Sequence, residues 1–202
     1  ATPPVDWSGS NQPIHGMVHR FALWGYGNLN DPHRTYKSLD TNHENFTGTP
    51  FSLSIFPGVG ERLVCGVSFK TLPFFFKRPR GIFWIDDDDP NTVNWFPRKL
   101  TDAVGAASPG AVLLISTALG DDILFLSADG TFHLVSAIDP STGSIVNSDL
   151  GDALEINTFI RRNANLARLD QAVSRWYGHK KKALFAVPRT GSAENDLILE
   201  FD

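Results

Sequence analysis

The sequence contains very little sulfur and no long hydrophobic run. Its 202 residues include one cysteine, Cys65, and one methionine, Met17. A lone cysteine has no intrachain partner, which excludes a small domain held together by disulfides. The longest apolar run, residues 111–115, is far shorter than the ~20 residues that a membrane-spanning helix needs. We therefore expect no contact with a membrane.

Aromatic residues, in contrast, are abundant: the chain has 15 Phe, 5 Trp and 3 Tyr. So many aromatic and β-branched residues exclude a disordered chain, and this length suffices for one sizeable core or two small ones. The net charge of −4 argues against sequence-specific DNA binding. Because the chain starts at Ala1 and its methionine stands at position 17, we expect it to be processed or to be a piece of a longer protein.

Short apolar runs separated by turn residues recur along the chain, which is the pattern of β-strands. The expected strands are residues 21–26, 34–39, 51–56, 62–69, 72–77, 82–85, 93–96, 111–116, 123–127, 131–135, 182–187 and 197–201. Residues 157–176 differ, because they contain no Gly or Pro and space their apolar side chains near the helical period. Part of this stretch predicts one helix.

The hairpin turns follow a regular spacing. They centre near Leu29, Arg78, Asp129 and Gly191, roughly 50 residues apart and further apart where the helix is inserted, and a period of ~40–50 residues is typical of propeller blades. We therefore predict an all-β fold, a small β-propeller of about four blades with one inserted helix, over residues 17–202. Residues 1–16, rich in Pro, Ser and Gly, read as an extended arm. A β-sandwich is the alternative fold.

Several motifs follow one another in a characteristic order. They are HRFALWG with NDPHRTYKS, NHENF, FFFKR with GIFWI, and ILFLSADG. In this order they resemble the β-propeller virion proteins of tailed bacteriophages, found in the head-to-tail and tail (stabilisation or nozzle-like) apparatus. The resemblance covers roughly residues 17–202, although members of that family are usually longer and have more blades.

The resemblance implies a structural protein of the virion, without catalysis or cofactor. It implies assembly with other proteins of the head–tail connector or tail, as a symmetric homo-oligomer, and non-specific contact with packaged DNA. In the arm, Trp7 is the one large apolar residue, and we expect it to anchor in a neighbouring subunit.

Four consecutive carboxylates, Asp86 to Asp89, follow one of the expected strands. Asp86 and Asp88 are the candidate ligands for a hard cation such as Ca²⁺, which prefers oxygen ligands. Their spacing does not match an EF-hand loop, and neighbouring side chains of an extended loop point in different directions. We therefore expect no metal site and interpret the loop as solvated or, through Asp87 and Asp89, as a contact to a neighbouring subunit.

Two basic clusters are candidates for contact with DNA or with another subunit. One is expected in a hairpin turn and the other just before a strand; they consist of Lys77, Arg78 and Arg80, and of Lys180, Lys181 and Lys182. Lysine and arginine side chains bind phosphates along a DNA channel, but they bind acidic loops of a neighbouring subunit equally well. The negative net charge favours the subunit contact.

Two other functions are weighed against this structural role. A propeller-type carbohydrate- or receptor-binding module of the tail is the alternative, with Trp24, Tyr26, Trp95 and Tyr177 as stacking platforms if their rings are exposed. A glycoside hydrolase would need two carboxylates converging in one pocket, from pairs such as Asp86/Asp88 or Asp121/Asp122. We expect no enzyme, and a buried, unreactive thiol at Cys65.

Overall fold

The chain is built from antiparallel β-structure. The computed structural model describes residues 11–40, 42, 45–46, 51–118, 120–137 and 155–202. Trp7 and the rest of residues 1–10 lie outside the described residues. Within them, fourteen strands form four small antiparallel sheets, so the prediction of an all-β fold is confirmed.

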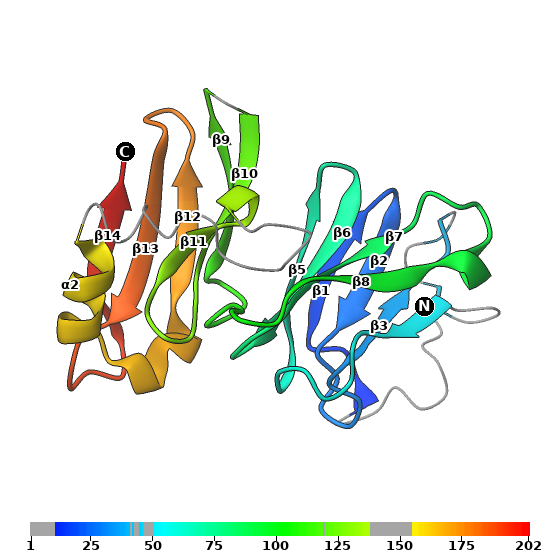
Figure 1. Cartoon of the computed structure of the whole chain (residues 1–202), viewed down its shortest axis with the longest axis horizontal. Helices are drawn as coiled ribbons and strands as arrows, with labels where there is room; N and C mark the ends of the chain where they lie inside the picture. Colours follow the sequence, from blue (N-terminus) through cyan, green and yellow to red (C-terminus); the bar gives the residue numbers. More distant parts are fainter. Residues whose placement is uncertain (1–10, 41, 43–44, 47–50, 119, 138–154) are drawn as a thin grey trace.

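The four sheets follow one another along the chain, and each is a simple meander (Figure 1). Sheet 1 consists of β1 (His15–His19), β2 (Ala22–Tyr26), β3 (Arg34–Lys37) and β4 (Phe51–Ser54). Sheet 2 consists of β5 (Arg62–Phe69), β6 (Leu72–Arg78), β7 (Ile82–Asp86) and β8 (Phe96–Thr101). Sheet 3 consists of β9 (Val112–Thr117), β10 (Gly120–Leu126) and β11 (Phe132–Leu134). Sheet 4 consists of β12 (Val173–Tyr177), β13 (Lys182–Pro188) and β14 (Asn195–Phe201).

The prediction that part of residues 157–176 forms a helix is confirmed. Helix α2 covers Ile156–Asn163 and a 3-10 helix covers Leu166–Gln171, but the chain is extended again in β12. Further 3-10 turns cover Thr92–Asn94 and Val135–Ala137. The strand expected at 93–96 is therefore wrong, because the Asn91 side chain accepts a hydrogen bond from Val93 N and starts a helical turn there. None of the described helices is long and apolar enough to cross a bilayer.

The structure also corrects the boundary of the expected arm. His15 and Gly16 belong to β1, which pairs with β2 in the register His15↔Tyr26 to His19↔Ala22. The two-residue turn between these strands is formed by Arg20 and Phe21, both with positive φ. Such turns ordinarily contain Asn-Gly, so the sequence gives no signal for this hairpin.

The core consists of three apolar clusters, one between each consecutive pair of sheets. Trp24 and Phe75 belong to the cluster between sheets 1 and 2, Phe76 and Phe125 to the one between sheets 2 and 3, and Phe185 to the one between sheets 3 and 4. The middle sheets bury both faces, because successive strand residues point to opposite sides. Among the described residues, no apolar cluster joins sheet 4 to sheet 1.

Both faces of β10 illustrate this arrangement. Ile123 and Phe125 pack toward sheet 2, whereas Leu124 and Leu126 pack toward sheet 4. A strand buried on both faces reads as a continuous apolar run, which explains the uninterrupted ILFL of this segment. The α2 residue Ile160 closes the end of the cluster between sheets 3 and 4.

Candidate functional site: an inter-sheet polar network and a central hollow

The acidic loop begins at the last residue of β7, and its side chains diverge. Asp86 approaches Arg98 on the neighbouring strand, with 3.4 Å between Oδ2 and Nη2. Asp89 accepts hydrogen bonds from Asn91 N at 2.7 Å and from Asn94 Nδ2 at 2.8 Å, and these bonds lower the pKa of its carboxyl group. Within the described part of the chain, no three His, Cys, Asp or Glu side chains are grouped as metal ligands.

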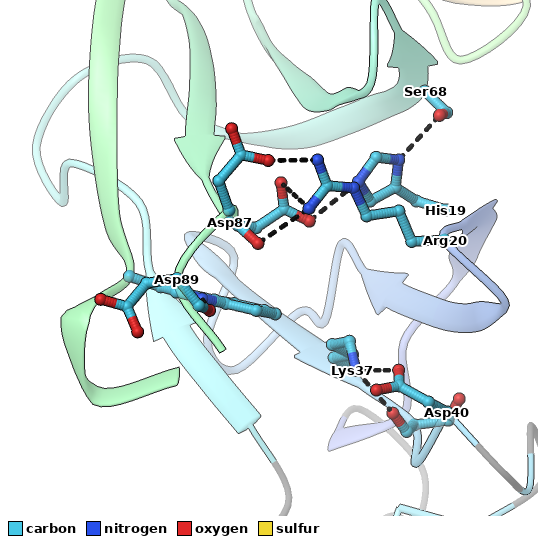
Figure 2. Close-up of polar contacts among 10 residues, drawn as sticks. His19, Arg20, Lys37, Asp40, Ser68, Asp87 and Asp89 are labelled. Atoms are coloured by element: carbon cyan, nitrogen blue, oxygen red, sulfur yellow. Dashed lines mark hydrogen bonds and ion pairs between the residues drawn. The ribbon is translucent and has the colours of Figure 1, made fainter. Parts of the chain in front are cut away.

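Asp87 is buried, which corrects the expectation that it contacts a neighbouring subunit. Only 4% of the residue is exposed, and its Oδ2 lies 2.9 Å from His19 Nε2. Arg20 Nη1 donates to the Asp87 carbonyl at 2.9 Å and lies 3.5 Å from Oδ1. Arg20 also pairs with Asp88, the other candidate cation ligand, and this hydrogen bond raises the pKa of the guanidinium. Figure 2 shows how these groups converge.

His19 connects this loop to a second strand of sheet 2. Its Nδ1 lies 2.7 Å from Ser68 Oγ, near the end of β5, and the ring itself is buried while Ser68 is exposed. When Nε2–H donates to the carboxylate and the imidazole is neutral, Nδ1 accepts from the Ser68 hydroxyl. The network therefore ties the end of sheet 1 to two places in sheet 2. Sequence reasoning missed it, because Ser68 and Asp87 stand 49 and 68 residues from His19.

The aromatic residues considered as sugar platforms are largely internal. Trp24 is fully buried and Tyr26 is 3% exposed, and the Tyr26 hydroxyl accepts a hydrogen bond from Gly66 N at 2.8 Å. Trp95 stacks on Trp24 with ring centroids 6.1 Å apart and donates to the Asp89 carbonyl at 2.6 Å. Of the four candidates, Tyr177 is the exposed one.

Lys77 does not lie in the turn expected from the sequence. It is part of β6 and is fully buried, so the expected contact with DNA or a subunit is not available to it. Its Nζ donates to the Phe56 carbonyl at 2.7 Å and lies 3.0 Å from His33 Nδ1. Burial lowers the pKa of Lys77 to about 8. Arg78 is half-buried, and Arg80 is exposed in the turn that follows.

The second basic cluster is split between two environments. Lys182 pairs with Glu200 and, at 2.9 Å, with Asp202, and these hydrogen bonds raise the pKa of its ammonium group. Lys180 and Lys181 are exposed in the turn between β12 and β13. That turn follows the first strand of its sheet, whereas the Arg80 turn follows the second strand of sheet 2. The exposed residues of the two clusters therefore lie in turns of different sheets, between different pairs of strands.

A shallow hollow of about 540 Å³ lies where the four sheets meet. Its wall contains residues from the first strand of every sheet: Val18, Cys65, Gly66, Val67, Ser68, Val112, Leu113, Leu114, Ser174, Arg175 and Trp176. The first strands β1, β5, β9 and β12 therefore all border this hollow. Burial raises the pKa of the Cys65 thiol to about 12, so this group stays protonated and a poor nucleophile at neutral pH.

These observations define an all-β protein whose four antiparallel sheets pack in chain order around one hollow. No protein-family model matches the sequence, and a search of curated proteins gives no significant match.

Proposed function

We propose that this chain is a structural virion protein of a tailed bacteriophage, part of the head–tail connector or tail complex, and that it folds as an open four-bladed β-propeller. The convergence of β1, β5, β9 and β12 on one hollow is the observation that carries the propeller. Each sheet then acts as a blade with its first strand innermost, as in propellers. A β-sandwich would instead place two sheets face to face around a single core.

The role in assembly is supported by the two ends of the sheet array. Apolar side chains remain exposed at both ends, among them Val18 (69%) and Phe21 (82%) on sheet 1 and Ile198 (69%) on sheet 4. A terminal sheet that leaves large apolar side chains exposed is a candidate surface for contact with another protein. The resemblance of the ordered motifs to those of virion propellers supports the head–tail or tail complex as the assembly that these ends serve.

The inter-sheet network is consistent with a rigid structural body. His19, Arg20 and Asp87 use their polar atoms to join sheet 1 to sheet 2. The chain of Ser68, His19 and Asp87 has the connectivity of a hydrolase triad. Ser68, however, meets Nδ1 rather than Nε2, and the adjoining hollow is shallow, so we assign the network a mechanical role.

The alternative is a carbohydrate- or receptor-binding module of the tail. Burial removes Trp24 and Tyr26 as stacking platforms, because a buried ring cannot receive a sugar. Tyr177, 46% exposed with Lys180 Nζ 5.9 Å from its ring, keeps this alternative testable. Binding on a glycan array that disappears in Tyr177→Ala would favour it over the purely structural role.

The structural role is tested by particle composition and by imaging. Mass spectrometry of purified particles of the encoding phage should detect the chain, and antibodies against it should label the head–tail junction or tail in electron micrographs. Two-dimensional class averages of the purified protein should show a rotationally symmetric oligomer. A strictly monomeric protein that is absent from purified particles would contradict the proposal.

A further inference from the structure

The outer edge of sheet 4 differs from the outer edges of the other sheets. The outermost strand of sheet 1, β4, has four residues, and that of sheet 3, β11, has three. The outermost strand of sheet 2, β8, contains Pro97, Arg98 and Lys99. Short strands, prolines and basic residues are the usual protection of a sheet edge against pairing. The strand β14, NDLILEF, has seven residues and contains no proline or basic residue, and its charged residues are Asp196 and Glu200.

The edge of β14 that faces away from β13 has no described partner strand. Among the described residues, the ladder of β14 joins it to β13 alone, and no other backbone hydrogen bond involves its residues. Sheets 1 and 2 each have four strands, whereas three described strands form sheet 4. No described strand therefore occupies a fourth position beside β14.

A hollow of about 490 Å³ runs along this edge. Four consecutive residues, 197–200, line it. Since successive strand residues point to opposite faces, a hollow that touches all four lies along the edge of the strand rather than above one face. The opposite wall is α2, including Ile156 and the exposed Phe159. Figure 1 shows α2 in yellow beside the red strand β14. The hollow suits an extended segment that carries a large apolar side chain.

We propose that this edge accepts residues 1–10 of a second copy of the chain as an added strand, with Trp7 in the hollow beside α2. The inference rests on the proposed function, because it requires association between copies. An added strand gains affinity from main-chain hydrogen bonds and specificity from pockets for alternate side chains. Prolines 3 and 4 lack an N–H, so pairing begins at Val5 and places Trp7 within the paired segment.

The length and attachment of the arm fit this acceptor. Ten extended residues span at most about 35 Å, more than the ~24 Å of a seven-residue strand. Residue 11 is held on sheet 1, where Asn28 Nδ2 donates to its carbonyl and Asn30 Nδ2 to its side chain at 2.5 Å. Sheet 4 lies at the opposite end of the molecule (Figure 1). An arm leaving sheet 1 of one copy thus meets sheet 4 of the copy beside it.

Charge argues for the arm and against pairing of β14 with a second β14. An antiparallel pair centred on Ile198 would place Asp196 opposite Glu200 of the other copy, and like charges directly opposite each other destabilise a sheet. Residues 1–10 contain a single carboxylate, Asp6, and no other charged side chain. The arm therefore meets the acidic edge with less repulsion.

A peptide of residues 1–10, labelled with a fluorophore, tests the acceptor in a chain that lacks these residues. Fluorescence anisotropy should show saturable binding, at least tenfold weaker for a Trp7→Ala or Val5→Pro peptide. Ile198→Asp in the truncated chain should abolish binding. Val93→Asp is the matched control, because Val93 is also exposed (85%) but lies in the 3-10 turn between β7 and β8. Absence of binding, or equal effects of both substitutions, would overturn the inference.

Disulfide trapping distinguishes a second copy from the same chain. A mixture of two single variants, Asp6→Cys and Ile198→Cys, should give covalent dimers, whereas Asp6→Cys mixed with Arg98→Cys on the edge of β8 should not. No dimer in the first mixture, together with an intrachain disulfide in the double variant, would show that the arm pairs with its own sheet and would overturn exchange between copies.

The failures of the two proposals can be told apart. Oligomers that persist unchanged after removal of residues 1–10 would overturn the arm exchange and leave the structural role in the virion intact. Arm exchange between copies of a chain that is absent from purified particles would overturn the virion role and leave the inference standing.

Discussion

At the scale of single residues, Lys77 has the clearest consequence for stability. Its buried ammonium group is held by the Phe56 carbonyl, and its pKa is lowered to about 8, against about 10.4 for lysine in an unfolded chain. Between these pH values the unfolded state binds more protons than the folded state. The free energy of unfolding therefore increases as the pH rises from 8 to about 10.4.

Replacing Lys77 by Met should remove this increase. Across the same pH window, the free energy of unfolding of the native chain should rise by about 2–3 kcal/mol relative to Lys77→Met. Urea denaturation of both proteins at pH 7.5 and pH 10.5 measures the difference, and the ionisation of other groups, such as the Cys65 thiol, cancels in it. A difference that does not vary with pH would show that Lys77 stays charged in the fold.

The turn between β5 and β6 also stores strain in two residues. Lys70 and Thr71 both have positive φ (48° and 68°), a conformation that costs non-glycine residues about 1 kcal/mol each. The double variant K70N/T71G supplies the residues that such hairpin turns favour. We expect the free energy of unfolding to increase by about 1–2 kcal/mol and Tm to rise, as measured by calorimetry.

The variant R20N/F21G changes the equivalent turn of sheet 1. Its free energy of unfolding should increase less, because it loses the Arg20 contacts to Asp87 and Asp88. Equal gains would contradict this account.

At the scale of elements, the bond between His19 and Asp87 should act as a clamp between sheets 1 and 2. His19→Ala removes the hydrogen bond between His19 and the buried Asp87 carboxylate. Removing one partner of such a buried pair typically costs about 3 kcal/mol of stability. The double variant H19A/D87A should cost less than the sum of the single variants, because the two side chains interact. Ser68→Ala should cost less than ~1 kcal/mol, since its exposed hydroxyl also bonds water. Denaturant titration measures the free energy of unfolding of the single variants at His19 and Asp87, of the double variant and of Ser68→Ala.

The same set of variants distinguishes the clamp from a catalytic triad. A fluorophosphonate reagent, which labels activated serines, should leave Ser68 unmodified. Labelling of Ser68 that depends on His19 would contradict the mechanical role.

Elements with local signals were predictable, and those set by distant partners were not. The strand expected at 62–69 coincides with β5, because a continuous apolar run identifies a strand with buried faces. In contrast, β12 alternates exposed and half-buried residues, and most of it falls within residues 157–176, where the apolar spacing predicts a helix and no strand. The burial of Lys77 and Asp87 depends on His33 and His19, 44 and 68 residues away, and such contacts leave no mark in the local sequence.

At the scale of the whole molecule, the four sheets form an array whose stability resides in the contacts between neighbours. Sheets 2 and 3 have an apolar cluster on both faces, whereas sheets 1 and 4 have one described cluster each. In repeat arrays of this kind, terminal units depend on a single interface and open more readily than central ones. A closed ring, in which sheet 4 packs on sheet 1, would instead give each sheet two neighbours.

Hydrogen exchange measured by mass spectrometry distinguishes these two arrangements. For the isolated chain at low concentration, we expect the slowest exchange in β6 and β10, the central strands of sheets 2 and 3, and faster exchange in β2 and β13. Association should then slow exchange in sheets 1 and 4 more than in the middle sheets, because the partner proteins bind to the free faces of these two terminal sheets. Equal protection of all four sheets in the isolated chain would show a ring closed on itself and leave no free ends for assembly.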